Sequence, residues 1–139
     1  LHSLALTAGG AVWSWGHGDC GMLGHGDQQR QLLPKKVEAF DGQRVLAVAA
    51  GEYHSLTLTA DGAVWSWGGG RLGNLGRGGG EHRGRPKKVE AFAGQRVVAV
   101  SAGYSPSLAI TADGEVWSWG HGYHGMLRHG PSSSRRRRR

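Results

Sequence analysis

The chain has 139 residues, 26 of them Gly, and a formal net charge of +7. Leu, Ile, Val and Phe supply about 19% of it, and so low a fraction with a high charge is typical of disordered chains. Six Trp side chains can nevertheless supply core area. No apolar run reaches the roughly 18 residues of a membrane-spanning helix, and the lone Cys20 cannot form an internal disulfide. Composition therefore excludes a helical membrane protein and a disulfide scaffold, and we expect no membrane partner.

A repeat of 52 residues organises the chain, since Trp13, Trp65 and Trp117 follow one another at that spacing. Residues 1–52 and 53–104 align without a gap and share 33 identical positions. A third copy keeps the register over 105–130, and residues 131–139 then depart from it. We therefore predict one domain over 1–130, with about 2.7 repeats, and a disordered Ser/Arg tail over 131–139.

Each repeat predicts four short strands, which we take from the best-preserved stretch of the chain. Residues 45–50 are apolar, and residues 54–59 alternate with period two. Asp61-Gly62 predicts a two-residue hairpin turn into a third strand over 63–67. A fourth strand is expected over 87–92, after a Gly-rich loop. Four antiparallel strands per repeat predict an all-β fold, a partial β-propeller with four-stranded blades.

The pattern from Val48 to Gly68, followed by Gly73, Leu75, Gly76 and Gly78, resembles the regulator of chromosome condensation repeat. The resemblance covers residues 1–130 and implies a propeller of about seven blades, of which we expect this chain to be a fragment. Family members include an exchange factor for a nuclear small GTPase that docks on nucleosomes, HECT-type ubiquitin ligases and a plant ultraviolet-B photoreceptor. The stretch from Val12 to Gly21 most resembles the large HECT-type ligases.

Three departures from the family pattern stand out in the aligned copies. Gly replaces the usual Asn two places after each Trp-Gly, and the usual Gln of the loop motif is Met22, Asn74 or Met126. Pro106 stands in the third copy where the other copies have His. Because proline lacks a backbone donor, we expect that strand to be distorted or to lie at a sheet edge.

Several recurring residues are expected to be structural. Both Trp of each strand should lie on one face and pack between blades, in preference to a light-sensing role. The His at the start of the second strand is expected to make a hydrogen bond that fixes the blade turn, and the Gly after each Trp pair ends its strand. The predicted structural residues are Trp13, Trp15, Trp65, Trp67, Trp117, Trp119, His54 and Gly68.

The residue pattern predicts no enzyme, cofactor or metal site. Ser14, Ser66 and Ser118 lie within strands and not on a nucleophile elbow. No nucleotide-binding loop occurs, because the Gly runs are not followed by a helix or by Gly-Lys-Ser. His17 and His25 lie near Cys20, but their spacing fits no common zinc pattern and is absent from the second copy.

Partner contacts are expected in the loop that differs most between copies, since variable loops on a repeated scaffold usually carry binding. That loop contains Arg77, Glu81, His82, Arg83 and Arg85. The recurring Lys35-Lys36 and Lys87-Lys88 are assigned mainly to protecting an edge strand. A nucleic-acid or nucleosome contact would rest on the basic tail of Arg135, Arg136, Arg137, Arg138 and Arg139, without which the charge falls to +2.

Two functional hypotheses follow. The first is a non-enzymatic protein-interaction module, such as the substrate- or partner-binding part of a ubiquitin ligase. The second is a guanine-nucleotide exchange regulator of a nuclear small GTPase that associates with chromatin. Either role is expected in the cytoplasm or the nucleus, with a ubiquitination substrate or the GTPase as the protein partner.

Overall fold

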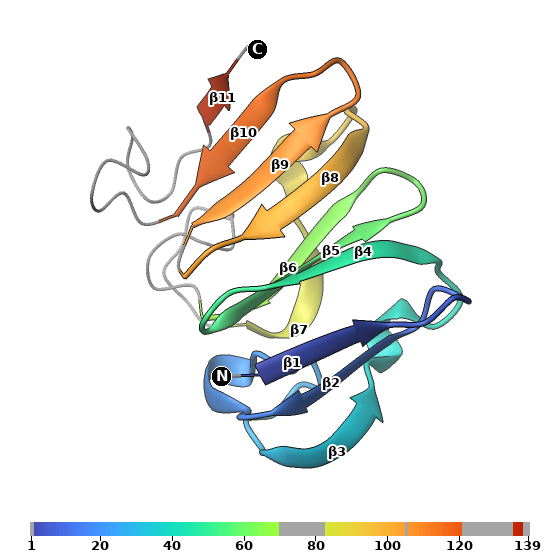
Figure 1. Ribbon diagram of the computed structural model, residues 1–139, viewed down its shortest axis with the longest axis vertical. Coiled ribbons are helices and arrows are strands. Elements are labelled where there is room, and N and C mark those ends of the chain that lie inside the picture. The colour runs from blue at the N-terminus through green and yellow to red at the C-terminus, as the bar shows by residue number, and fades with distance from the viewer. Residues whose placement is uncertain (1, 70–82, 105, 121–134, 138–139) are drawn as a thin grey trace.

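The computed structural model describes residues 2–69, 83–104, 106–120 and 135–137. These residues form three antiparallel sheets, which follow one another along the long axis of the molecule (Figure 1). We call them the first, middle and last blade. In the described residues there is no α-helix, and hence none long and apolar enough to cross a membrane.

The blades are built from consecutive strands. The first contains β1 (His2–Leu6), β2 (Val12–Gly16) and β3 (Gln31–Lys36). The middle contains β4 (Val45–Ala50), β5 (His54–Thr59), β6 (Val64–Gly68) and β7 (Arg83–Lys88). The last contains β8 (Val97–Ala102), β9 (Ser107–Thr111), β10 (Val116–Trp119) and β11 (Arg135–Arg137). Short 3-10 turns are η1 (Asp19–Gly21), η2 (Glu38–Phe40) and η3 (Glu90–Phe92).

The fourth strand of the middle blade differs from the sequence-based expectation. It occupies 83–88 and not 87–92, because the chain leaves the sheet edge after Val89 donates its amide to the Val64 carbonyl at 2.8 Å. The next residues turn into η3, which places Phe92 in the core between the middle and last blades. Alternation over 87–92 would place Val89 and Ala91 on one face, whereas the buried residues are Val89 and Phe92, at the three-residue spacing of a 3-10 turn.

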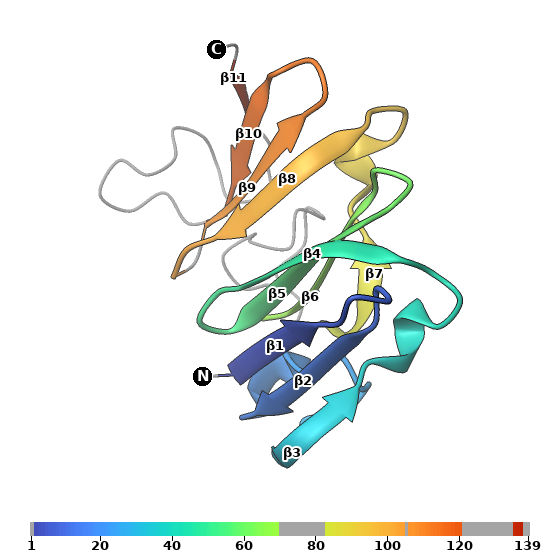
Figure 2. The same ribbon diagram turned by 45° about the vertical axis from the view of Figure 1, so that its right-hand side comes forward.

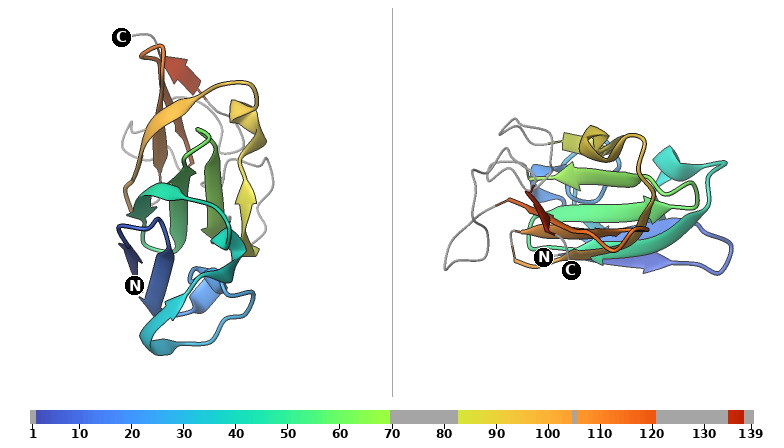
Figure 3. Two further views of the ribbon diagram at one scale, coloured as in Figure 1. Left: turned by 90° about the vertical axis from the view of Figure 1, so that its right-hand side faces the viewer. Right: turned by 90° about the horizontal axis from the view of Figure 1, so that it is seen from above.

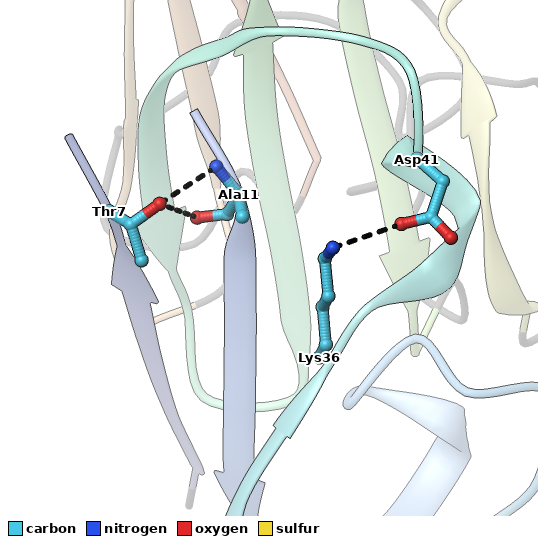
Figure 4. A network of polar contacts seen from close by, with 4 residues as sticks. All are labelled: Thr7, Ala11, Lys36 and Asp41. Atoms are coloured by element: carbon cyan, nitrogen blue, oxygen red, sulfur yellow. Dashed lines mark hydrogen bonds and ion pairs between the residues drawn. The ribbon is translucent and has the colours of Figure 1, made fainter. Parts of the chain in front are cut away.

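The hairpins that join β1 to β2, β5 to β6 and β9 to β10 each have three loop residues. The predicted two-residue turn at Asp61-Gly62 is therefore wrong. Thr59 donates its amide to the Ala63 carbonyl at 3.0 Å, and Gly62 has a φ of +86°. A type I turn followed by a left-handed Gly is a common three-residue hairpin. In the first blade the Asp is absent, and the Thr7 hydroxyl accepts the Ala11 amide at 3.0 Å (Figure 4).

Pro106 is accommodated by shortening its strand. β9 begins at Ser107, one residue later than the equivalent start of β5 at His54. The strand still lies inside its sheet, between β8 and β10, and not at an edge. The turn before it is kept, because the Pro106 carbonyl accepts the Gly103 amide at 3.0 Å. Proline therefore removes the histidine side chain from this position without disrupting the blade.

Three residues of the expected disordered tail lie in a strand. β11 pairs with β10 so that Arg135 faces Ser118 and Arg136 faces Trp117. In the middle blade Lys87 faces Ser66 and Lys88 faces Trp65. The arginines thus take the register of the recurring Lys pair, although they do not follow the repeat spacing. The remaining tail residues lie outside the described part of the chain.

The three sheets follow one another in space (Figures 2 and 3), and the buried apolar clusters lie between them. One buried cluster joins the first blade to the middle one through Val12, Val37, Phe40, Val45 and Trp67. A second joins the middle blade to the last through Leu56, Leu58, Val64, Val89, Phe92, Val97, Ala109 and Trp119. Most buried apolar side chains in the described residues therefore serve the contacts between successive sheets.

Candidate interaction surfaces and the contacts between blades

One backbone carbonyl joins the first blade to the middle blade. Met22, in the loop after β2, accepts a hydrogen bond from the Ser55 hydroxyl and another from the Trp67 indole N–H, each at 2.9 Å. All three residues are fully or almost fully buried. Buried hydrogen bonds of this kind are costly to leave unmade. The Met at the family's Gln position thus contributes its main chain to the contact between blades.

A histidine from one blade also bonds a serine of the next. His2 Nε2 lies 2.7 Å from Ser55 Oγ, and His54 Nε2 lies 3.1 Å from Ser107 Oγ. Because the Ser55 proton is donated to Met22, His2 must be the donor in its pair. The predicted histidine hydrogen bond therefore exists at His54, but it links two blades and does not fix a turn within one.

Both histidines are held in the neutral state, His54 fully buried and His2 partly buried. The pKa of His54 is lowered to about 4, mainly by burial and in part by the neighbouring His2. Burial also lowers the pKa of His2 to about 4, with a contribution from the positive N-terminus. Since a buried charge without a partner is costly, a neutral ring is the form that fits this position.

The hydrogen bonds of the Ser–His pairs run in the wrong direction for nucleophilic catalysis. Ser14 Oγ donates to the Leu23 carbonyl at 2.7 Å, so the His25 Nε2 at 3.0 Å donates to the serine and cannot take its proton. Ser14 is also completely buried. In the Ser14–His25 and Ser55–His2 pairs the histidine is therefore the hydrogen-bond donor and not a base that activates the hydroxyl.

The tryptophan pairs pack against a phenylalanine of the preceding blade. Phe40 lies 5.6 Å from Trp65 and 5.8 Å from Trp67, measured between ring centroids. In the same way, Phe92 lies 5.3 Å from Trp117 and 5.4 Å from Trp119, the tryptophans of the last blade. Trp13 and Trp15, in the first blade, are only half-buried. The shared face predicted for each pair is therefore the face that meets the neighbouring blade.

Gly68 stands where three segments meet. Its φ of +103° suits glycine, and a Cβ there would lie 2.5 Å from the Tyr53 carbonyl oxygen. The Met22 Cα would lie at 3.2 Å from the same Cβ, so the loop of the first blade closes on this position too. The recurring Gly is thus explained by a close backbone approach as well as by its dihedral angle.

The predicted partner loop is only partly described. Arg83 and Arg85 lie exposed on β7, which is the outer strand at the edge of the middle blade, as β3 is in the first blade. Arg77, Glu81 and His82 lie outside the described residues. The equivalent outer strand of the first blade has Leu32 and Leu33 exposed by 80% and 77%. The outer strands therefore present different side chains on the same backbone. Sequence reasoning missed this leucine pair, although its difference from Gly84-Arg85 is visible in the aligned copies.

The outer strands also carry the recurring positive charges. Lys35, Lys36, Lys87 and Lys88 are exposed, and Lys88 Nζ lies 5.5 Å from the Trp65 ring centroid. Lys36 forms an ion pair of 3.4 Å with Asp41 (Figure 4).

Within the described ranges, no three His, Cys, Asp or Glu side chains gather closely enough to hold a metal ion.

Comparisons with known proteins agree with this architecture. Two models of the regulator of chromosome condensation (RCC1) repeat match the chain, one over residues 9–58 and 61–110 and the other over 45–74 and 97–125. The chain is 47% identical over 131 residues to the E3 ubiquitin-protein ligase HERC2 of Homo sapiens, a match that covers 93% of the chain and 3% of HERC2. It is 39% identical to the ultraviolet-B receptor UVR8 of Arabidopsis thaliana, over 93% of the chain and 29% of UVR8.

A solved structure shows the same fold. Prp20p from Saccharomyces cerevisiae superimposes with a TM-score of 0.82 at 29% sequence identity, over 98% of this chain and 36% of Prp20p. The chain thus spans little more than a third of that protein and far less of HERC2. The predicted all-β, partial-propeller fold is confirmed.

Proposed function

Because the chain belongs to the regulator of chromosome condensation (RCC1) repeat family, we propose that it is a non-enzymatic propeller module that binds protein partners. The first blade, the middle blade and the last blade form the scaffold. The module would act in the cytoplasm or the nucleus as the substrate- or partner-binding part of a larger protein such as a ubiquitin ligase. Similarity to HERC2 supports that setting.

The observation that carries this proposal is that buried polar and aromatic residues make the contacts between blades, whereas the exposed residues of the outer strands differ from copy to copy. Ser, His and Trp side chains that could do chemistry are used in contacts between blades, as Ser55 and Trp67 are. The residues that differ between copies lie exposed on the outer strands, as Leu33 and Arg85 do. A constant scaffold with variable exposed positions is the arrangement by which repeat proteins bind partners.

The alternative is regulation of nucleotide exchange on a nuclear small GTPase with chromatin association. Its support is the structural likeness to Prp20p, a protein described by its binding to Gsp1p and histones. The basic tail also supports it, because its residues Arg135–Arg137 form the strand β11, which pairs with β10. The two hypotheses differ in one measurable property, which is acceleration of nucleotide release.

A cross-linking experiment tests the proposal. The full chain and a Leu32→Ser/Leu33→Ser variant would be expressed in cells and their cross-linked proteins quantified by mass spectrometry. Since both leucines are exposed, the variant should fold normally and lose a defined subset of partners. An Arg96→Gln variant, which changes an exposed charge outside the outer strands, serves as the control.

Two enzymatic assays accompany it. A ubiquitin thioester on Cys20, or release of GDP from a nuclear small GTPase above the background rate, would contradict a purely non-enzymatic module. Release of GDP would favour the exchange hypothesis instead. Identical partner sets for the chain and its leucine variant would remove the outer strands from the proposed binding surface.

A further inference from the structure

A small pocket lies between the outer strands of the first and middle blades. Its volume is about 70 Å³, and four basic side chains line it together with one carboxylate. These are His25, Lys35, Lys36 and Arg85, with Glu38 as the carboxylate. The positive charges of lysine and arginine side chains repel one another. Their convergence on one pocket therefore indicates a site for an anion.

The pocket is assembled by a contact between two blades. Gly26, in the loop after β2, donates its amide to the Gly84 carbonyl of β7 at 2.9 Å. Arg85 follows directly, and its guanidinium packs on Gly26 so closely that a Cβ there would lie 2.6 Å from Nη2. The absence of a side chain at Gly26 thus lets the guanidinium lie against the loop, beside the Lys pair of β3.

The positive charge of the pocket is only partly neutralised. Lys36 pairs with Asp41 at 3.4 Å. For Lys35 and Arg85 the structure shows no ion pair with any residue it describes. Counting Lys35, Lys36 and Arg85 against the carboxylates of Glu38 and Asp41 leaves one uncompensated positive charge.

His25 reports on this charge. Its Nε2–H is committed to Ser14, so Nδ1 is the nitrogen that would accept a further proton. Burial lowers the pKa of His25, and Lys35 lowers it further, whereas Asp27 and Glu38 act in the opposite direction. An anion beside Lys35 would offset the lysine charge and raise the pKa of His25.

We propose that this pocket binds one phosphoryl group, presented by a phosphorylated side chain of a protein partner. The proposal rests on the proposed function, that of a protein-binding module. A guanidinium and an ammonium are the usual ligands of phosphoryl oxygens, with arginine able to bind two of them at once. The volume suits one tetrahedral group and not a nucleoside. Nucleic-acid binding would need a longer row of phosphate contacts, which Glu38 interrupts here.

The site itself can be tested without knowing the partner. The full chain would be titrated with inorganic sulfate, which stays doubly charged through the pH range of interest, while the His25 ring signals are followed by NMR at constant ionic strength. We expect a saturable shift and a higher pKa of His25 with sulfate than with chloride. Arg85→Gln and Lys35→Gln should each weaken binding about tenfold, as loss of one charge-assisted hydrogen bond would, and Arg96→Gln should leave it unchanged.

A second arm tests the source of the phosphoryl group. Matched peptides with phosphoserine or serine, and a short DNA duplex, would be compared as competitors of sulfate. Displacement by the phosphopeptide only supports the proposal. Displacement by the DNA duplex at equal or lower concentration would overturn the assignment to a protein partner. Linear, non-saturating shifts, or equal shifts in Arg85→Gln with unchanged circular dichroism, would show that no site exists. If the chain binds sulfate but the cross-linking experiment finds no protein partner, the anion site stands and the proposed function fails.

Discussion

Protonation of His54 should destabilise the stack of blades in mildly acidic solution. The ring is completely buried, and its Nδ1 has no hydrogen-bond partner in the described residues. Its pKa is lowered from 6.5 to about 4 by burial and by His2. As the pH falls, the unfolded chain therefore takes up the proton first. The stability that the neutral ring provides is complete above pH 6.5 and is lost as the pH falls to about 4.

The size of this effect follows from the shift. At 1.36 kcal/mol per pKa unit, a shift of about 2.5 units is worth about 3 kcal/mol in the free energy of unfolding. That is a large share of the roughly 5–15 kcal/mol that stabilises an ordinary domain. Most of it should already be lost at pH 4.5.

The assay compares the chain with a His54→Gln variant by urea unfolding at several pH values between 7.5 and 4.5. Because all other titrating groups are shared, the difference in pH dependence isolates His54. We expect the original chain to lose about 2–3 kcal/mol more than the variant. Parallel pH profiles would refute the reasoning. Should the variant unfold already at neutral pH, an NMR titration of the His54 ring decides the matter, and a pKa near 6.5 would contradict a buried neutral histidine.

Three further changes should destabilise the chain by other routes, each measured by chemical or thermal unfolding. Phe92→Ala removes the ring between both tryptophans of the last blade and should cost about 3–5 kcal/mol; a cost below 1 kcal/mol would show that the last blade does not pack there. Ser55→Ala leaves the His2 donor unpaired and should cost about 1–3 kcal/mol, whereas an unchanged midpoint would argue against that hydrogen bond. Gly68→Ala meets both a φ of +103° and the Tyr53 carbonyl, so it should cost more than Gly94→Ala, which has open space; equal costs would remove the argument from close approach.

The repeat made the architecture predictable. A spacing of 52 residues and alternating strands identified the blades, and the paired faces of Trp65 and Trp67 followed from period two. The turn into η3 was not predictable, because Phe92 occupies an apolar position that fits a strand as well as a 3-10 turn. The pairing register of β11 could not be predicted either. A run of identical arginines has no alternation that would indicate which residue faces Trp117.

The pocket between the outer strands illustrates the same limit for the candidate site. Lys35-Lys36 and Arg85 are visible in the sequence, but they are about 50 positions apart, and their patterns indicate different roles. Only the hydrogen bond from Gly26 to Gly84 brings them to one place. Contacts between blades depend on how strands from successive repeats are offset, and period two within a strand does not encode that offset.

The contact between successive blades has a direction. The leading blade gives a carbonyl, a phenylalanine and a histidine, and the following blade gives a serine hydroxyl, an indole N–H and the faces of two tryptophans. Such head-to-tail joints leave two unlike ends on any stack and can be added or removed one whole unit at a time. Deleting 52 consecutive residues would rejoin a complementary pair of faces, whereas deleting half that length would bring together two surfaces that do not match. Growth and loss of blades by whole repeats is thus favoured by the chemistry of the joint itself.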